Sequence, residues 1–376
     1  MKSHPRHQII AALGGVLCLV VSGCGGITQQ GADSGASAGC KSDTVLEQVK
    51  DMPAQERTAK LQELAKQEGT GISMYGDLGR DELDGVLNAF KQKFGIGVET
   101  YSATSEEVLQ RLGSESQADQ VQGDLLQNNG TELTQAGDKG LLAKVTSPYA
   151  AALPPEVVFP TWVGTQYNIF TVLRNNSVIP DADAPRTYQD LADPKYDGKI
   201  GIEAGNFDLF ATVVRYLQDH EGMSEAQAID LWRKIADGAL VYTSNTPLAD
   251  AVNQGELGLA ITYNHYYSRL HARGGSNLQW QPAIQPQVMR PNGVGIPCRA
   301  PHPATALLLF DFFISEDGQR ALAEKVNRDV TNPNVKAGLL YGTDLERIYV
   351  NLEDVITQSD RWRTQYDEIT RNAQAG

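Results

Sequence analysis

Polar and aromatic residues follow several short apolar runs in this sequence. These polar segments are residues 75–77, 128–130, 203–206, 243–246 and 263–267. If the apolar runs are strands of an open α/β sheet, the segments lie beyond the carboxyl ends of those strands, where such sheets bind ligands. Phenol, amide and carboxylate groups there can bind a small molecule or a cation. The candidate binding residues are Tyr75, Asp77, Asn129, Asn206, Tyr263 and Asn264.

Four carboxylates stand at or near the same strand ends. They are Asp77, Glu132, Glu203 and Asp208. Acidic side chains in loops are usually solvated, because burying an unpaired charge is costly. We therefore expect each of these carboxylates to face water.

The familiar signatures of catalysis are missing from the sequence. It has no H-E-x-x-H, no phosphate-binding G-x-x-x-x-G-K and no G-x-G-x-x-G after an apolar run. Residues 35–39 match G-x-S-x-G, but that motif needs a strand before it and a helix after it, and neither is predicted here. The sequence therefore favours a binding protein over an enzyme.

The order of the predicted elements indicates an α/β fold with mostly parallel sheets. Apolar runs predict strands at 72–75, 98–101, 125–126, 199–203, 240–243 and 257–262. Helical periodicity fills the intervals between them, and Thr104 with Glu107 and Ser224 with Gln227 form capping boxes. Such alternation is typical of βαβ units. After Pro282 we expect irregular chain, then an apolar helix at 304–314 and a helical C-terminus.

The N-terminus has the layout of a secretory signal. Lys2 and Arg6 precede an apolar stretch at 9–21, which is shorter than the ~20 residues of a membrane-spanning helix. Residues 21–24 resemble a bacterial lipobox, which implies lipidation of Cys24; the alternative is an ordinary signal peptide. We expect a signal at 1–23, a flexible spacer at 24–43, and an exported protein held at the outer face of the membrane or in the periplasm.

Two cysteines remain once Cys18 has left with the signal and Cys24 carries lipid. Disulfides persist in an oxidising compartment, and two thiols without a nearby histidine make a poor metal site. The sequence favours a disulfide between Cys40 and Cys298, with two free thiols as the alternative.

Charge and length exclude some classes of partner. The 376 residues carry 46 acidic and 32 basic side chains, a net charge of −14 that becomes −16 without residues 1–23. An acidic surface argues against nucleic acid, which requires a concentrated basic field, and is compatible with attracting a cation. The length suggests two domains, and we expect a monomer.

Several segments resemble the substrate-binding proteins of bacterial ABC importers, in the type II periplasmic binding protein class. Residues 75–90 match Y-x-x-x-x-x-D-E-L-x-x-x-x-x-A-F, residues 190–201 match DL-x-DP-K-x-x-GKIG closely, and residues 300–319 match APHP…SEEGQ. The resemblance implies two lobes, each a mostly parallel sheet flanked by helices, with the ligand between them. Crossover strands, one of them at 162–175, would act as the hinge. We expect 44–170 with 291–376 as lobe 1 and 171–290 as lobe 2.

Residues 264–270 resemble the N-x-Y-Y-x-x-R-L element of ferric-ion-binding proteins in this superfamily. The resemblance implies that Tyr266 and Tyr267 supply phenolate oxygens to Fe(III). Hard cations prefer oxygen ligands, and a bound cation can keep a phenol deprotonated.

The sequence departs from the ferric pattern at other positions. Residues 78–80 lack the usual His or Tyr, and Asn129 stands where many relatives have an acid. Tyr167 is a candidate third phenolate, with Thr165 and Gln166 holding a synergistic anion. The alternative is a small organic solute, such as a polyamine, a thiamine-like cation, a phosphonate or a carboxylate.

The resemblance also implies the partners. They are a membrane permease and a separate ATPase, since the chain has no nucleotide-binding motif. We expect no cofactor; Fe(III) would be the transported ligand. Rival interpretations are an exported enzyme and a structural surface lipoprotein.

Overall fold

The structure is a computed structural model that describes residues 39–69, 71–326 and 328–375. The predicted signal, Cys24 and most of the predicted spacer lie outside the described residues. The helices are α1 (Asp43–Val49), α2 (Ala54–Glu68), α3 (Arg80–Phe94), α4 (Ser105–Gln117), α5 (Gly130–Asp138), α6 (Phe207–Glu221), α7 (Glu225–Asp237), α8 (Asn245–Gln254), α9 (His265–Ala272), α10 (Pro303–Ile314), α11 (Glu316–Val326), α12 (Leu352–Thr357) and α13 (Ser359–Ala375). Within the described part of the chain, no helix is long and apolar enough to cross a membrane.

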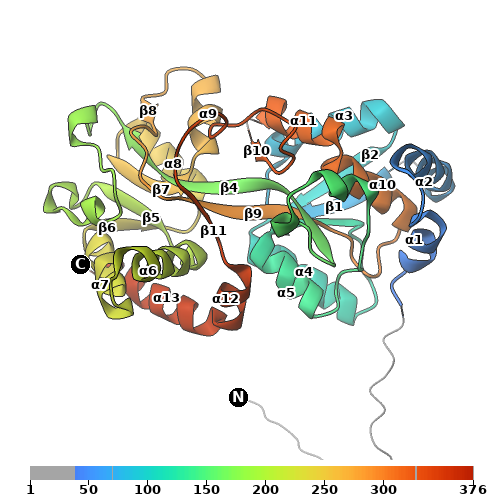
Figure 1. The fold of residues 1–376 in the computed structure, drawn as a ribbon, viewed down its shortest axis with the longest axis horizontal. Coiled ribbons are helices and arrows are strands. Elements are labelled where there is room, and N and C mark those ends of the chain that lie inside the picture. The colour runs from blue at the N-terminus through green and yellow to red at the C-terminus, as the bar shows by residue number, and fades with distance from the viewer. Residues whose placement is uncertain (1–38, 70, 327, 376) are drawn as a thin grey trace, which may run out of the picture. The chain divides into compact units, whose positions relative to one another are not determined.

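The strands of the described residues form one mixed sheet (Figure 1). Its main order is β2-β1-β3-β9-β4-β7-β5-β6. The strands are β1 (Gly71–Gly76), β2 (Gly97–Ser102), β3 (Leu125–Asn129), β4 (Trp162–Asn175), β5 (Ile200–Glu203), β6 (Ala239–Tyr242), β7 (Leu259–Tyr263), β8 (Leu278–Gln279), β9 (Gln287–Gly295), β10 (Asp329–Val330) and β11 (Arg347–Tyr349).

Two parallel groups of strands flank a pair of long antiparallel strands. Strands β1, β2 and β3 run parallel to one another, and so do β5, β6 and β7. Between the groups, β9 pairs antiparallel with β3 and β4, and the second half of β4 pairs with β7. We call β1–β3 with α1–α5, α10 and α11 lobe 1, β5–β7 with α6–α9 and α13 lobe 2, and β4 and β9 the crossover strands. The predicted α/β fold class is confirmed.

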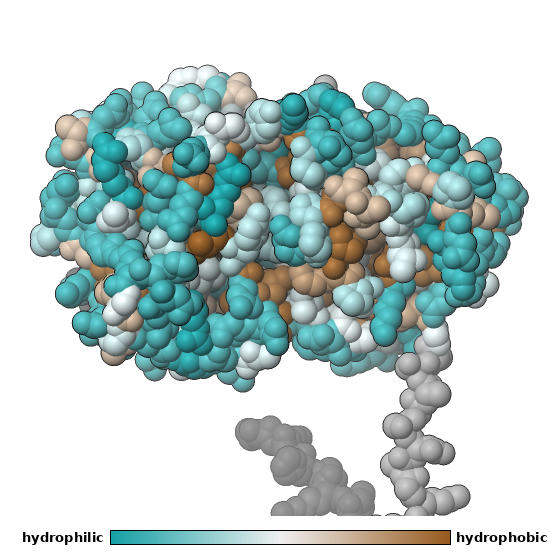
Figure 2. All heavy atoms as spheres, viewed as in Figure 1, coloured by the Kyte–Doolittle hydropathy of each residue, from teal (hydrophilic) through white to brown (hydrophobic). Residues whose placement is uncertain are grey.

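Local sequence signals explain most of the elements. The predicted capping boxes at Thr104 and Ser224 are present and begin α4 and α7. Helix α10 is apolar apart from Thr305 and Asp311, and its residues from Ala304 to Ile314 are buried between neighbouring elements. Polar residues cover most of the face in Figure 2, and apolar residues gather near its middle.

The crossover strand β9 lies where we expected irregular chain after Pro282. This prediction is wrong because Pro291 and two glycines obscure the strand pattern in the sequence. Every residue of β9 is nevertheless buried, since neighbouring strands pair with it on both sides. The strand brings Arg290 and Asn292 into the protein interior.

The C-terminal helix α13 packs on lobe 2, which differs from the predicted placement of 291–376 in lobe 1. Its residues Trp362 and Tyr366 are fully buried and contact the ring of Phe210 in α6. The Tyr366 hydroxyl donates a hydrogen bond to the carbonyl of Glu203 at the end of β5 (2.8 Å). These aromatic side chains determine where the helix docks, although it follows lobe 1 segments in the sequence.

Cys40 and Cys298 form a disulfide in the structure. The backbone N–H of Lys41 also donates to the carbonyl of Cys298 (2.8 Å). The bond therefore fixes the chain just before α1 to the segment between β9 and α10.

Candidate functional site

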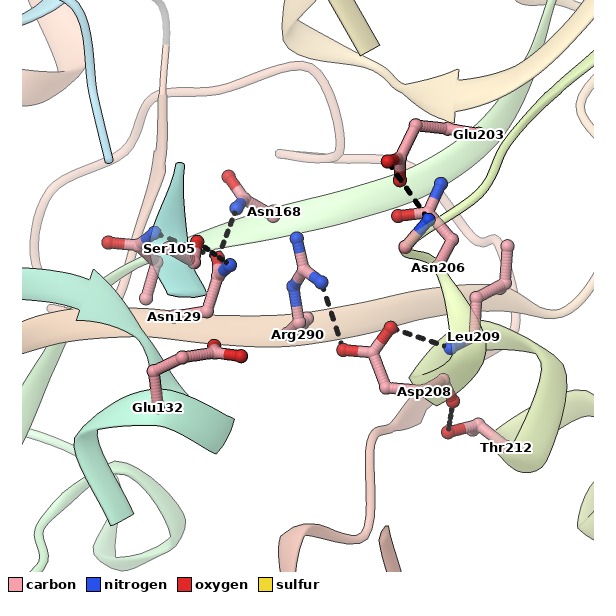
Figure 3. Close-up of polar contacts among 12 residues, drawn as sticks. Ser105, Asn129, Glu132, Asn168, Glu203, Asn206, Asp208, Leu209, Thr212 and Arg290 are labelled. Atoms are coloured by element: carbon pink, nitrogen blue, oxygen red, sulfur yellow. Dashed lines mark hydrogen bonds and ion pairs between the residues drawn. The ribbon is translucent and has the colours of Figure 1, made fainter. Parts of the chain in front are cut away.

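Polar side chains from both lobes meet at the crossover strands. Asn168 of β4 and Arg290 of β9 are cross-strand partners, and Figure 3 shows them between groups of the two lobes. Each lobe contributes residues from a strand end or from the first turn of the following helix. Six residues of the resulting interlobe polar cluster are labelled in Figure 3: Asn129 and Glu132 from lobe 1, Asn168 and Arg290 from the crossover strands, and Glu203 and Asp208 from lobe 2. Tyr263 of lobe 2 belongs to the same cluster through its contact with Arg290.

Arg290 is the central cation of this cluster. Its Nη1 donates to Oδ2 of Asp208 (2.9 Å), and its Nη2 donates to the Tyr263 hydroxyl. The guanidinium also lies over the rings of Phe170 and Tyr263, at 5.1 and 5.2 Å from their centres. The side chain is buried, and its Nε has no hydrogen-bond partner. Arg290 thus links a crossover strand to lobe 2 and keeps one donor free.

Three of the four carboxylates that we expected to face water are buried, and the fourth, Asp77, is half-buried. Asp208 is 1% exposed, Glu132 6% and Glu203 9%. Burial raises the pKa of Glu132 and of Glu203 from 4.5 to about 7, and it also raises the pKa of Asp77. The prediction is wrong because the strand ends of the two lobes face each other rather than solvent.

A network of amide side chains continues the cluster into lobe 1. Asn129 Oδ1 accepts hydrogen bonds from Asn168 (3.1 Å) and Asn292 (3.2 Å). Gln127 donates to Asp77 (2.8 Å) and to Asn292. The predicted residues Asp77 and Asn129 therefore belong to one hydrogen-bonded network.

The predicted cleft residues of lobe 2 are Asn206, Tyr263 and Asn264. The first two meet at the cluster, and Asn264 lies beside it. The Tyr263 hydroxyl donates to Asn206 Oδ1 (3.5 Å). Asn264 instead donates to Asp329 (3.0 Å), in the segment that follows α11.

Three further predicted residues have other surroundings. The Tyr75 hydroxyl donates to Glu115 of α4 (2.9 Å), away from the cluster residues. Thr165 donates to the Asn292 carbonyl (3.3 Å). Gln166 is buried, and both polar atoms of its side chain lack a partner.

The three tyrosines predicted to bind metal lie in three different environments. The Tyr266 hydroxyl hydrogen-bonds to Thr246 (3.0 Å), and the half-buried Tyr267 packs on His271. Tyr167 packs on Tyr349, and strand alternation puts it on the opposite face of β4 from Asn168. Burial raises the pKa of both Tyr167 and Tyr266. The metal-ligand roles stay predictions.

A pocket of about 750 Å³ lies beside the cluster, between lobe 1 and α13. Its lining includes Glu132 and Arg363, whose charged groups are 3.9 Å apart. Arg363 also pairs with Glu106 of α4 and lies over the ring of Phe207. The pocket connects Glu132 of the cluster with the surface between the lobes.

Residues 85–341 match the family model described as bacterial extracellular solute-binding protein. This chain belongs to that family. Its predicted place among the substrate-binding proteins is therefore confirmed.

Known relatives of this solute-binding protein agree with the assignment. Iron uptake protein A1 of Synechocystis sp. is 26% identical over 252 residues, which is 62% of this chain and 68% of the relative. Iron-bound HitA from Pseudomonas aeruginosa has a TM-score of 0.68 at 20% identity, covering 80% of this chain and 99% of HitA. AfuA from Actinobacillus pleuropneumoniae, with fructose-6-phosphate bound, has a TM-score of 0.69 at 19% identity, covering 81% and 99%. At these identities the two solved structures show the fold alone.

Arg290, Asn168 and Asn292 of this solute-binding protein were not predicted from the sequence as site residues. Asn168 lies in the predicted crossover strand at 162–175 but was not assigned to the site, and Arg290 and Asn292 lie in the stretch that we expected to be irregular. The available signal for Arg290 was a charged residue directly after the apolar residues Val288 and Met289, a weak signal because Pro291 interrupts the pattern.

Proposed function

We propose that this protein is the lipid-anchored solute-binding component of an ABC importer. It would be exported, held to the membrane through Cys24, and would deliver its ligand to a permease served by a separate ATPase. The observation that carries the proposal is the interlobe polar cluster. Buried polar groups usually have partners, yet Arg290 Nε in the cluster and Thr131 Oγ1, next to Glu132 in the chain, have none. Such atoms near the junction of two lobes are suited to a ligand that the lobes enclose.

Ferric iron is the ligand that we propose first, bound by Tyr266, Tyr267 and Tyr167. The names of relatives support it, since they include an iron uptake protein and an iron-bound structure. The Arg269 guanidinium lies 4.5 Å from the centre of the Tyr266 ring, where its charge favours the phenolate. Among the described residues, no group of three or more His, Cys, Asp and Glu side chains is arranged to hold a metal ion, so the tyrosines would have to supply oxygens. The unpaired amide of Gln166 is available for a synergistic anion.

A small organic anion is the second candidate. Arg290 Nε has no partner, and a guanidinium donor is of the kind that binds phosphate or carboxylate groups. A neighbour of the same fold holds fructose-6-phosphate. Neither candidate requires turnover, and we propose that the protein is not an enzyme.

The test is the absorbance of the purified protein titrated with ferric citrate. Phenolate coordination to Fe(III) gives a visible charge-transfer band, which should vanish in Y266F/Y267F. The control Y341F changes a tyrosine that is 55% exposed and should keep the band. No band and no thermal shift with ferric citrate would contradict the iron assignment. A thermal shift with fructose 6-phosphate in the same assay would favour the organic anion.

A further inference from the structure

Arg328 joins lobe 1, a crossover strand and lobe 2 through one guanidinium group. Its Nη1 donates to Asn168 Oδ1 of β4 and to His265 Nδ1 of α9, at 3.0 Å each. Its Nη2 donates to Glu82 of α3. The side chain is 1% exposed, so these contacts form away from water. Hydrogen bonds to a buried charge are among the stronger polar contacts in proteins.

The next residue makes a second link to the same part of lobe 2. Asp329 accepts a hydrogen bond from Asn264 (3.0 Å) and from the backbone N–H of Leu340 (3.0 Å). The segment 328–329 therefore holds both Asn264 and His265. These two residues directly precede Tyr266 and Tyr267 in the chain.

The contact with Arg328 also fixes the orientation of the His265 ring. Because a guanidinium can only donate, His265 Nδ1 is the acceptor and the proton of the neutral ring is on Nε2. The ring packs against Tyr266 with centres 4.4 Å apart and stacks on Tyr263 at 5.6 Å. A ring so fixed limits the positions that Tyr266 can take.

We propose that Arg328 is a positioning residue of the ligand site, which sets the start of α9 when the two lobes meet. Its partners come from three elements, and the contact with His265 of lobe 2 requires the lobes to be together. Lobe closure and the placement of Tyr266 are thereby coupled through one side chain. This inference rests on the proposed function, because it assigns Arg328 to the capture of a ligand between the lobes.

The test compares R328Q and R328K with the wild-type protein. Without ligand, small-angle X-ray scattering should give R328Q a larger radius of gyration, because the link between the lobes is lost. The affinity for ferric citrate should fall by about tenfold or more in R328Q, the loss expected from hydrogen bonds to a charged group. R328K keeps the charge but not the forked geometry, so its affinity should lie between the two.

The matched control is R57Q. Arg57 is also fully buried and pairs with Asp311 (2.6 Å), but both residues belong to lobe 1. R57Q should lower the melting temperature while keeping the wild-type radius of gyration and affinity. If R328Q does not fold, E82Q is the second variant. It removes a carboxylate that lies 3.6 Å from His265 Nε2 across the lobes, and it should enlarge the radius of gyration.

Two results would overturn the inference: an unchanged radius of gyration in folded R328Q, or R57Q changing it equally. If the wild-type protein does not bind ferric citrate, the ligand assignment fails, but the scattering comparison without ligand still decides the role of Arg328.

Discussion

The burial of charged side chains is the feature that most distinguishes the candidate site at the scale of single residues. Glu132, Glu203 and Asp208 come from two lobes and share one nearby guanidinium, that of Arg290. An isolated carboxylate would be expelled from such a position or would take up a proton. The raised pKa values of Glu132 and Glu203 reflect this cost.

The raised pKa values predict how stability depends on pH. The folded protein binds protons at Glu132 and Glu203 between pH 4.5 and about 7, where the unfolded chain releases them. The free energy of unfolding should therefore fall as the pH rises through this window, by up to about 3 kcal/mol for each group. The E132Q protein should lack the part of this pH dependence that Glu132 contributes. Its free energy of unfolding at pH 8 should be higher than that of the wild type.

Urea denaturation at pH 5 and pH 8 measures this dependence. E63Q, which changes an exposed side chain, is the control and should retain the wild-type difference between the two pH values. An E132Q protein with the full wild-type difference would contradict the burial argument.

Strand ends could be recognised from the sequence, but their surroundings could not. Asn129, Asn206 and Tyr263 were predicted at strand ends, and the structure puts all three at or beside the cluster. Arg290 was not predicted, because whether a charge inside a strand is buried depends on pairing with distant segments. Glu132 and Asp208 were predicted to be solvated loop acids for the same reason, because long-range pairing could not be derived from the sequence.

Helices and strands with strong local signals were predicted well at the scale of elements. The capping boxes of α4 and α7 and the apolar run of α10 are confirmed. Strand β9 escaped prediction, since its proline and glycines suit a loop and its pairing partners are remote in sequence. The docking of α13 on lobe 2 likewise depends on the complementary shapes of aromatic side chains rather than on chain order.

The aromatic contact between α13 and α6 predicts a large loss of stability when Trp362 is truncated. Its side chain is fully buried beside Phe210 and beneath the guanidinium of Arg361. W362A should lower the free energy of unfolding by about 3–5 kcal/mol, as expected for a buried aromatic residue. L240A truncates a side chain that is 51% exposed and should change it by less than about 0.5 kcal/mol. Equal losses in the two variants, measured by chemical denaturation, would show that α13 is not anchored in this way.

At the scale of the described molecule, two α/β lobes, each with parallel strands, share the crossover strands β4 and β9. The polar residues of these strands lie where the strand ends of both lobes converge (Figure 3). Strand β4 pairs with β9 and with β7 of lobe 2. A ligand held beside β4 would therefore contact a crossover strand and lobe 2 at the same time. This arrangement suits capture by hinge closure, the motion common to proteins that enclose a ligand between domains.

Hydrogen exchange of the backbone amides, with and without ferric citrate, tests the capture of a ligand between the lobes most directly. We predict added protection in segments 128–132, 203–208 and 263–268 at once, since they belong to both lobes, and none with citrate alone. Protection confined to one lobe, or protection elsewhere in the chain with these segments unchanged, would contradict the account.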